Sequence, residues 1–211
     1  MLFAGAQAHA ESVIYSNLPV DPGNFSGGWV IAGPNSSLGD GQVHIVAVSF
    51  TPTTDFLFTQ IDAAIGFIDG SSSSETLSLV ADDGTGAPDL TSAPIDTWTV
   101  TLSPWDATSL VTVLNTKVDP LTAGTQYWIE ASAQGDTFAA WDISTQGDKG
   151  PILNDAGVNT NVLGAFDVMG NAVVAGQQGD TPEPATLATT LGGGLLLLLV
   201  GARRRTGSRG I

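Results

Sequence analysis

The chain has 211 residues, no cysteine and a formal net charge of −15. Of its 21 acidic residues, 20 lie between positions 11 and 180, where the only lysines or arginines are Lys117 and Lys149. That segment therefore carries a formal charge of −18, which repels nucleic acid and anionic membrane surfaces and argues against both as its partners. The absence of cysteine excludes disulfides and thiolate metal sites, so the fold must be stabilised by packing alone.

The first ten residues are interpreted as the remnant of a signal peptide. Ala8-His9-Ala10 fits the A-x-A pattern that precedes signal-peptidase cleavage, which makes Glu11 the first mature residue. Residues 1–10 contain no basic n-region and too few apolar residues for a complete h-region. We therefore expect the start of the signal to precede this sequence, with an ordinary flexible N-terminus as the alternative.

Residues 11–175 are predicted to form one extracellular domain, an all-β antiparallel β-sandwich or jelly roll of about ten strands. Apolar residues recur with a period of two and hardly ever with a period of 3.6, as half-buried strands require. Short strands separated by turn residues are typical of such folds. Between positions 56 and 68 the face predicted to point inward is Leu57, Thr59, Ile61, Ala63, Ile65 and Phe67. The predicted strands are 12–16, 28–32, 42–50, 56–68, 75–81, 96–102, 109–114, 126–133, 137–144 and 161–168.

One loop carries a candidate calcium site. Asp82, Asp83 and Asp89 lie close together in the sequence around a glycine turn, and calcium binds six to eight oxygen ligands at about 2.3–2.6 Å. The spacing does not follow the EF-hand pattern, which needs a bidentate glutamate at its twelfth position. An ordinary polar turn is the alternative that we favour, and no other cofactor is expected.

The tryptophans are candidates for carbohydrate binding, because their aromatic faces are large and partly polar at one edge. Trp98 alternates with apolar residues of its strand and is predicted to lie in the core. Trp105 follows a proline in a loop, and Trp128 shares a strand face with Glu130. Trp105 and Trp128 are therefore the two tryptophans that we expect to be exposed.

Catalytic motifs are scarce, and we predict that the domain is not an enzyme. His44 is the one histidine between positions 11 and 180 and lies in a strand-like segment, and no serine occupies a Gly-x-Ser-x-Gly elbow. We therefore expect His44 to be a satisfied or edge-strand histidine. Glu130 and Asp142 fall within predicted strands and are the candidates for a glycosidase carboxylate pair. A glycoside hydrolase is kept as the third hypothesis, after a carbohydrate-binding module.

Short motifs between about positions 40 and 145 resemble the choice-of-anchor β-sandwich modules of exported bacterial proteins. The segments that carry the resemblance are 48–50, 78–84, 86–88, 121–129 and 138–141. The resemblance implies a β-sandwich. No catalytic residues are assigned to that module, so it implies none here.

The C-terminal segment, 182–211, follows a predicted flexible stalk at 176–181. It begins with Pro182-Glu183-Pro184 and ends in a basic tail, 203–211, that opens with Arg203-Arg204-Arg205. Positions 184–202 contain no charged residue, and a helix of that length spans roughly 28 Å, close to the hydrocarbon thickness of a bilayer. We predict a transmembrane helix over about 185–202 with its arginine end in the cytoplasm, a buried core helix being the alternative. Its anchor residues are Leu191, Leu195, Leu196, Leu197, Leu198, Leu199 and Val200.

A Pro-Glu-Pro motif, an apolar helix and a basic tail in this order resemble the PEP-CTERM sorting signal of Gram-negative bacteria. The resemblance implies that an exosortase recognises the segment, cleaves near the motif, and releases or re-anchors the protein. It also implies passage from an inner-membrane anchor with a periplasmic body to the cell surface or extracellular matrix, in association with exopolysaccharide or biofilm. We therefore expect an exported, non-enzymatic surface or matrix protein that meets the sorting machinery, the membrane and extracellular polysaccharide.

Overall fold

A computed structural model describes residues 11–19, 25–105, 110–115 and 117–173 of the chain. These residues belong to one compact unit that ends at Val173. The predicted signal peptide, stalk, sorting motif, transmembrane helix and basic tail lie outside the described residues. Within the described part, no helix is long and apolar enough to cross a membrane.

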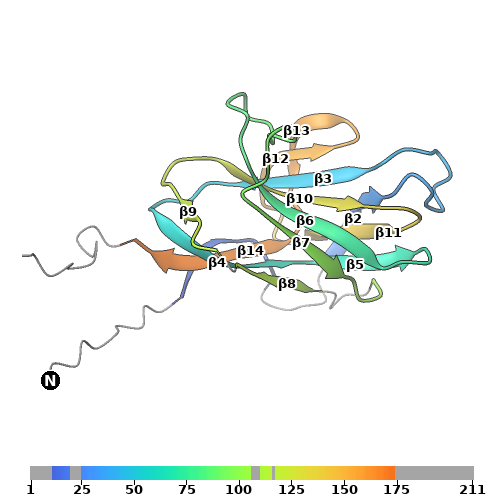
Figure 1. The fold of residues 1–211 in the computed structure, drawn as a ribbon, viewed down its shortest axis with the longest axis horizontal. Coiled ribbons are helices and arrows are strands. Elements are labelled where there is room, and N and C mark those ends of the chain that lie inside the picture. Colours follow the sequence, from blue (N-terminus) through green and yellow to red (C-terminus); the bar gives the residue numbers. More distant parts are fainter. Residues whose placement is uncertain (1–10, 20–24, 106–109, 116, 174–211) are drawn as a thin grey trace, which may run out of the picture. The chain divides into compact units, whose positions relative to one another are not determined.

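The described residues form fourteen strands and no helix (Figure 1). The strands are β1 (Ser12–Ser16), β2 (Phe25–Ala32), β3 (Ile45–Phe50), β4 (Phe56–Ala63), β5 (Ile65–Asp69), β6 (Ser74–Ala81), β7 (Asp96–Thr101), β8 (Val111–Leu114), β9 (Pro120–Leu121), β10 (Tyr127–Ala133), β11 (Phe138–Ser144), β12 (Lys149–Asn154), β13 (Gly157–Val162) and β14 (Phe166–Ala172).

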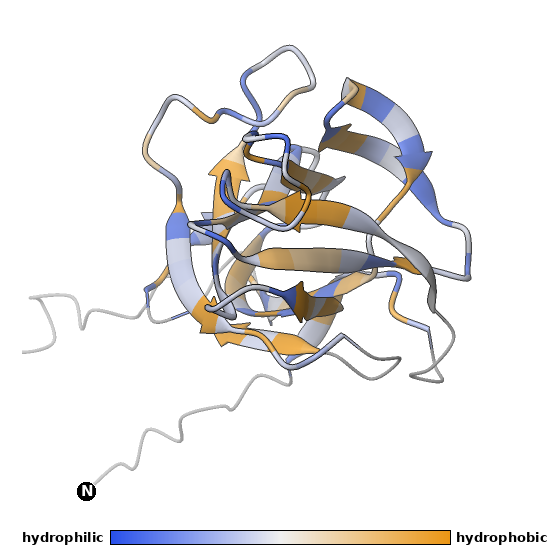
Figure 2. Ribbon diagram, turned by 90° about the vertical axis from the view of Figure 1, so that its right-hand side faces the viewer, coloured by the Kyte–Doolittle hydropathy of each residue, from blue (hydrophilic) through white to orange (hydrophobic). Residues whose placement is uncertain are grey.

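These strands pair antiparallel in three sheets. A five-stranded sheet has the order β1-β14-β4-β8, with β9 beside β4; a six-stranded sheet has the order β13-β12-β3-β10-β6-β7; and a three-stranded sheet has the order β2-β11-β5. One buried cluster draws side chains from all three sheets, including Ile61, Ile129 and Trp141, and hydrophobic residues concentrate in the strands (Figure 2). The arrangement is consistent with a β-sandwich, and it confirms the predicted all-β antiparallel fold class with more strands than expected.

The predicted long strand at 56–68 is wrong in two ways. It breaks at Ala64, whose N–H donates to Ala165 at 3.0 Å and whose carbonyl accepts from Asp142 at 2.7 Å, so β4 and β5 join different sheets. A bulge opposite Gly170 also reverses the inward face within β4. Phe58 is consequently buried while Leu57 is 36% exposed, the opposite of the predicted alternation in the first half of the segment.

The sequence analysis missed the hairpin of β12 and β13 and predicted a single strand at 161–168 instead. That span contains the end of β13, a connection and the start of β14. The hairpin is mostly half-buried or exposed, so it lacks the apolar alternation on which strand prediction depends. Pro151 lies within β12, and proline argues against a strand when the sequence is read alone.

Glu75 is a carboxylic acid buried in the core. It is 1% exposed and, by strand alternation, shares the inward face of β6 with Leu77 and Leu79. Neither of its carboxyl oxygens has a hydrogen-bond partner among the described residues. Burial raises the pKa of Glu75 to about 8, because the charged form loses its hydration. Glu75 is therefore protonated in the folded state at neutral pH.

Replacing Glu75 is expected to stabilise the protein at alkaline pH. The pKa of Glu75 is raised on folding, so its contribution to stability is constant below about pH 4.5 and declines towards pH 8, by up to about 1.4 kcal/mol per pH unit. Glu75→Gln removes this titration, and Glu75→Met also removes the unpaired oxygens. Urea unfolding of the full-length chain at pH 5 and pH 8 should show a variant advantage that grows with pH. An advantage of the same size at both pH values would contradict the assignment.

Candidate functional site

Asp82 organises the loop between β6 and β7 through hydrogen bonds. One carboxylate oxygen of Asp82 accepts the N–H groups of Gly84 at 2.8 Å and Gly86 at 3.2 Å. The other oxygen accepts the indole N–H of Trp128 at 3.1 Å. Asp82 therefore ties its own turn to the central strand β10.

Asp83 and Asp89 serve separate turns of the same loop. Asp83 accepts the backbone N–H of Thr85 at 2.8 Å, and Asp89 accepts those of Thr91 and Ser92, each at 3.0 Å. Hydrogen bonds from the Thr85 side chain to Asp83 and from the Ser92 side chain to Asp89 hold the pKa of each carboxyl below its usual range. The described residues contain no group of three His, Cys, Asp or Glu side chains suited to a metal ion. The hydrogen bonds of Asp82, Asp83 and Asp89 agree with the favoured alternative, an ordinary polar turn, and calcium binding by these three residues stays a prediction.

Trp128 is fully buried, so its prediction as an exposed sugar-stacking residue is wrong. It points to the side of β10 away from the main core and packs with Ala47 and Val80, and with the half-buried Leu153. Its indole N–H is satisfied by Asp82. The tryptophan therefore fastens the β6–β7 loop to the outer face of the six-stranded sheet.

Trp105 is 45% exposed, as the sequence analysis predicted. Its backbone N–H donates to Phe67 of β5 at 2.7 Å, and its indole N–H donates to the buried carboxylate of Asp142 at 2.5 Å. A methyl group on Gly66 would lie 2.6 Å from the Cα atom of Trp105, so this close approach requires glycine. Trp105 is thus an exposed aromatic ring in a fixed position.

A shallow groove separates two edge strands, β7 of the six-stranded sheet and β8 of the five-stranded sheet. It has a volume of about 400 Å³, and the nine residues that line it, from Trp98 to Thr101 and from Leu110 to Leu114, are all uncharged. Trp98 is half-buried and packs against the core, in partial agreement with its predicted core position. The sequence analysis missed this groove, because its two walls come from different sheets.

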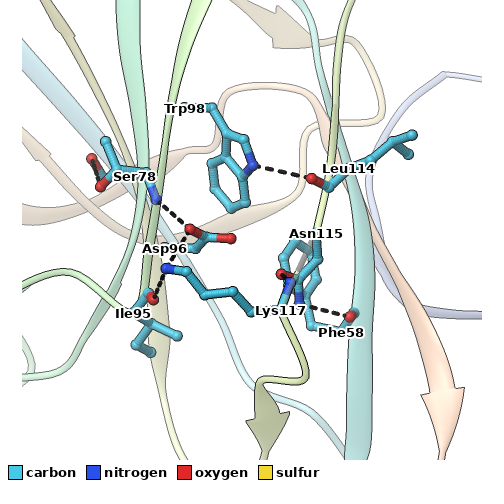
Figure 3. A network of polar contacts seen from close by, with 9 residues as sticks. Phe58, Ser78, Ile95, Asp96, Trp98, Leu114, Asn115 and Lys117 are labelled. Atoms are coloured by element: carbon cyan, nitrogen blue, oxygen red, sulfur yellow. Dashed lines mark hydrogen bonds and ion pairs between the residues drawn. The ribbon is translucent and has the colours of Figure 1, made fainter.

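Polar contacts link the two walls of this groove near Trp98 and Leu114 (Figure 3). The indole N–H of Trp98 donates to the carbonyl of Leu114 at 3.1 Å. The ammonium group of Lys117 lies 2.7 Å from the buried carboxylate of Asp96 and donates to the carbonyl of Ile95 at 3.3 Å. Because β7 and β8 belong to different sheets and do not pair, these side-chain contacts link them.

His44 lies between two carboxylates. Its Nδ1 atom is 2.8 Å from Oδ2 of Asp155, and its Nε2 atom is 2.8 Å from Oδ2 of Asp40. The hydrogen bond to Asp155 is the main cause that raises the pKa of His44 above its ordinary value, and Asp40 adds to it. His44 is therefore a satisfied histidine, as expected. A hollow of about 440 Å³ lies beside it, lined by residues 42–45 and 153–155.

The two strand carboxylates proposed for a hydrolase lie in different sheets. Glu130 is half-buried on β10, and burial raises the pKa of its carboxyl. Asp142 is buried on β11, where it accepts the indole N–H of Trp105.

A closer acidic pair escaped the sequence analysis. Asp62 of β4 and Asp167 of β14 lie directly opposite each other, a position where the Cβ atoms of two strands are about 5 Å apart. Asp62 accepts a hydrogen bond from Gln60 at 2.8 Å. Burial, with a contribution from the charge of Asp62, raises the pKa of Asp167. Only the register of the strands reveals this pair, because 105 positions of sequence separate its members.

In comparisons of the sequence with known proteins, no protein-family model matches the chain, and no curated protein is significantly similar to it. The function must therefore be argued from the residues and from the geometry above.

Removing the Asp82 carboxylate is expected to loosen the β6–β7 loop. Asp82→Ala leaves the buried indole N–H of Trp128 without an acceptor, which should lower the free energy of unfolding by about 1–3 kcal/mol. Asp83→Ala is the matched control, because Asp83 bonds only within its exposed turn, and its loss should be smaller. Urea unfolding followed by tryptophan fluorescence measures both. Equal losses for the two variants would show that the contact with Trp128 contributes little.

Proposed function

We propose that the protein is an exported, non-enzymatic surface or matrix protein delivered by a PEP-CTERM-like sorting segment. The observation that carries the proposal is the order of parts at 182–211: Pro182-Glu183-Pro184, an uncharged segment of transmembrane length and Arg203-Arg204-Arg205. An exosortase is the processing partner that this order suggests. The body would first lie in the periplasm on an inner-membrane anchor, and later at the cell surface or in the extracellular matrix.

The described domain suits this role. It is an antiparallel all-β unit that ends at Val173, just ahead of the predicted stalk. Its acidic side chains favour solubility and a dispersed state outside the cell. The absence of cysteine makes folding independent of the redox state of the compartment.

The proposal predicts C-terminal processing and an exported body. In a Gram-negative host that carries an exosortase, mass spectrometry of the mature protein should show loss of the apolar segment and the arginine tail. A variant with Pro182→Ala, Glu183→Ala and Pro184→Ala should retain the tail, and protease added to spheroplasts should still digest its body. A wild-type chain that keeps Ile211 in that host, or a body protected from the protease, would overturn the proposal.

Carbohydrate binding is the second candidate function, and Trp105 favours it. An exposed indole that is held by Phe67, Gly66 and Asp142 loses little side-chain entropy when a ligand stacks on it. A neutral or cationic polysaccharide is the expected ligand class, because an anionic one would meet the acidic surface. A glycoside hydrolase remains the third alternative, with Glu130 and Asp142 as its candidate carboxylates.

Affinity electrophoresis in gels that contain neutral polysaccharides, such as xylan or β-glucan, tests the second candidate. Trp105→Ala should abolish retardation by a polysaccharide that retards the wild-type chain, and Trp105→Phe should retain part of it. Trp29→Phe is the control, because Trp29 is half-buried and donates to the Val162 carbonyl. If the polysaccharide still retards the Trp105→Ala variant, the ring of Trp105 is not the binding surface. Release of reducing sugar, lost in Glu130→Gln or Asp142→Asn, would instead support the hydrolase.

A further inference from the structure

Two segments that are distant in the sequence meet at His44. The first is the loop 33–43, whose base is closed by two hydrogen bonds between the backbones of Ala32 and His44, at 3.1 and 2.9 Å. The second is the turn of the β12–β13 hairpin, which carries Asp155 and in which Gly157 has a φ of 81°. His44 contacts a carboxylate from each segment. One imidazole ring therefore contacts both the loop and the hairpin.

Asp40 and the turn that carries Asp155 are each held by hydrogen bonds other than those to the ring. Asp40 accepts the backbone N–H of Gln42 at 3.0 Å with the oxygen that does not contact His44. The hairpin turn beside Asp155 is fixed by Asn154, whose side-chain oxygen accepts the N–H of Ala156 at 3.0 Å. The Asp40 carboxylate is thus ordered independently of His44, and Asp155 lies in a turn whose backbone is ordered independently of it.

The geometry requires a charged imidazole. A neutral imidazole carries a hydrogen on only one ring nitrogen, so its other nitrogen would direct a lone pair at a carboxylate 2.8 Å away. The imidazolium ion donates from both nitrogens and balances part of the charge of two aspartates. The side chain of His44 is 13% exposed, whereas those of Asp40 and Asp155 are 43% and 62% exposed, so water can hydrate a carboxylate that loses its contact with the ring.

We propose that Asp40, His44 and Asp155 form a proton-operated latch that fastens the loop 33–43 to the β12–β13 hairpin. When His44 loses its proton, one of the two contacts changes from attraction to repulsion, and the loop separates from the hairpin. The hollow beside His44, which residues of both segments line, widens as they part. The latch goes beyond the proposed function and does not depend on it.

Among the described residues that line the hollow, His44 and Asp155 are the ionisable ones. On the neighbouring strands, Glu130 lies opposite Ala47, three residues along from His44, and Glu75 lies opposite Ala133 at the end of β10. The turn between β10 and β11 carries Asp136, and the carbonyls of its neighbours Gly135 and Thr137 accept the N–H groups of Asn35 and Gly33 in the loop. Three residues of strand correspond to about 10 Å, so Glu130 acts on His44 through a screened interaction.

The direction of the pH effect follows from the two contacts. The pKa of His44 is raised in the closed state, whereas in the open state it returns to about 6.5. Closure is therefore fully favoured below about pH 6.5 and is lost as the pH rises through the closed-state pKa. Between the two pKa values, the opening constant increases by up to about tenfold per pH unit.

The test uses the full-length chain with His9→Gln, so that His44 is the single histidine. NMR titration of the His44 ring should give a pKa above 6.5 that falls in Asp155→Asn and in Asp40→Asn, and that does not change in the control Asp83→Asn. Hydrogen exchange, corrected for its intrinsic pH dependence, should show opening of the loop 33–43 and of residues 154–157 together. The total increase in the opening constant should equal the ratio of the two acid dissociation constants of His44.

Three results would overturn the latch. The first is protection of both segments that does not change between pH 5 and 8.5. The second is a His44 titration that is the same in Asp155→Asn as in the wild type. The third is an unchanged pH dependence of opening in His44→Gln, a variant with no ring to titrate. If His44→Gln fails to fold, the two asparagine variants still decide, because each keeps the side-chain shape and removes only a charge.

Discussion

Carboxylates greatly outnumber cations in this domain, and their stabilisation is the constraint on which the rest of the structure depends. Among the described residues, Lys117 forms the one lysine–carboxylate ion pair, with Asp96. The loop aspartates instead accept backbone N–H groups, which are abundant in turns and carry a partial positive charge. The aspartates that do so are Asp40, Asp55, Asp69, Asp82, Asp83, Asp89 and Asp136. The acidic surface and the ordered turns are thus two consequences of one composition.

This arrangement divides the acidic groups into two classes with opposite pH dependence. In the turns, hydrogen bonds lower the pKa of Asp40, Asp83 and Asp136, so these groups stabilise the fold above about pH 4 and lose that effect in acid. Inside the sheets, burial raises the pKa of Glu75 and Asp167, so these groups favour the fold when protonated and disfavour it as the pH rises. Among the described residues, no cation contributes to the pKa of Glu75 or Asp167, so nothing there reverses the effect of burial.

The sequence predicts the fold class well because alternation and turn residues are local signals. It fails where a residue's neighbours are set by tertiary register. The bulge in β4 exchanges the inward and outward faces without any change in composition. Trp128 was expected to be exposed because it shares a face with Glu130, yet the β6–β7 loop supplies an acceptor for its indole through Asp82. Asp62 and Asp167 are adjacent only because β4 pairs with β14.

The groove between β7 and β8 and the hollow beside His44 both lie at the edges or ends of strands. The way in which polar groups are satisfied explains this position. Apolar side chains from all three sheets fill the core between them, and backbone ladders satisfy the polar groups at the centre of each sheet. At the edges, polar side chains satisfy these groups instead. Trp98 of β7 donates to Leu114 at the end of β8, and Lys117, which follows β8, pairs with Asp96 of β7. At the start of β3, His44 performs the same task between a loop and a hairpin. A lysine contact of this kind is insensitive to pH near neutrality, because lysine remains charged there, whereas a histidine contact is sensitive. Histidine at position 44 therefore makes the contact between the loop and the hairpin sensitive to pH near neutrality. The contact between Lys117 and Asp96 does not change over the same pH range.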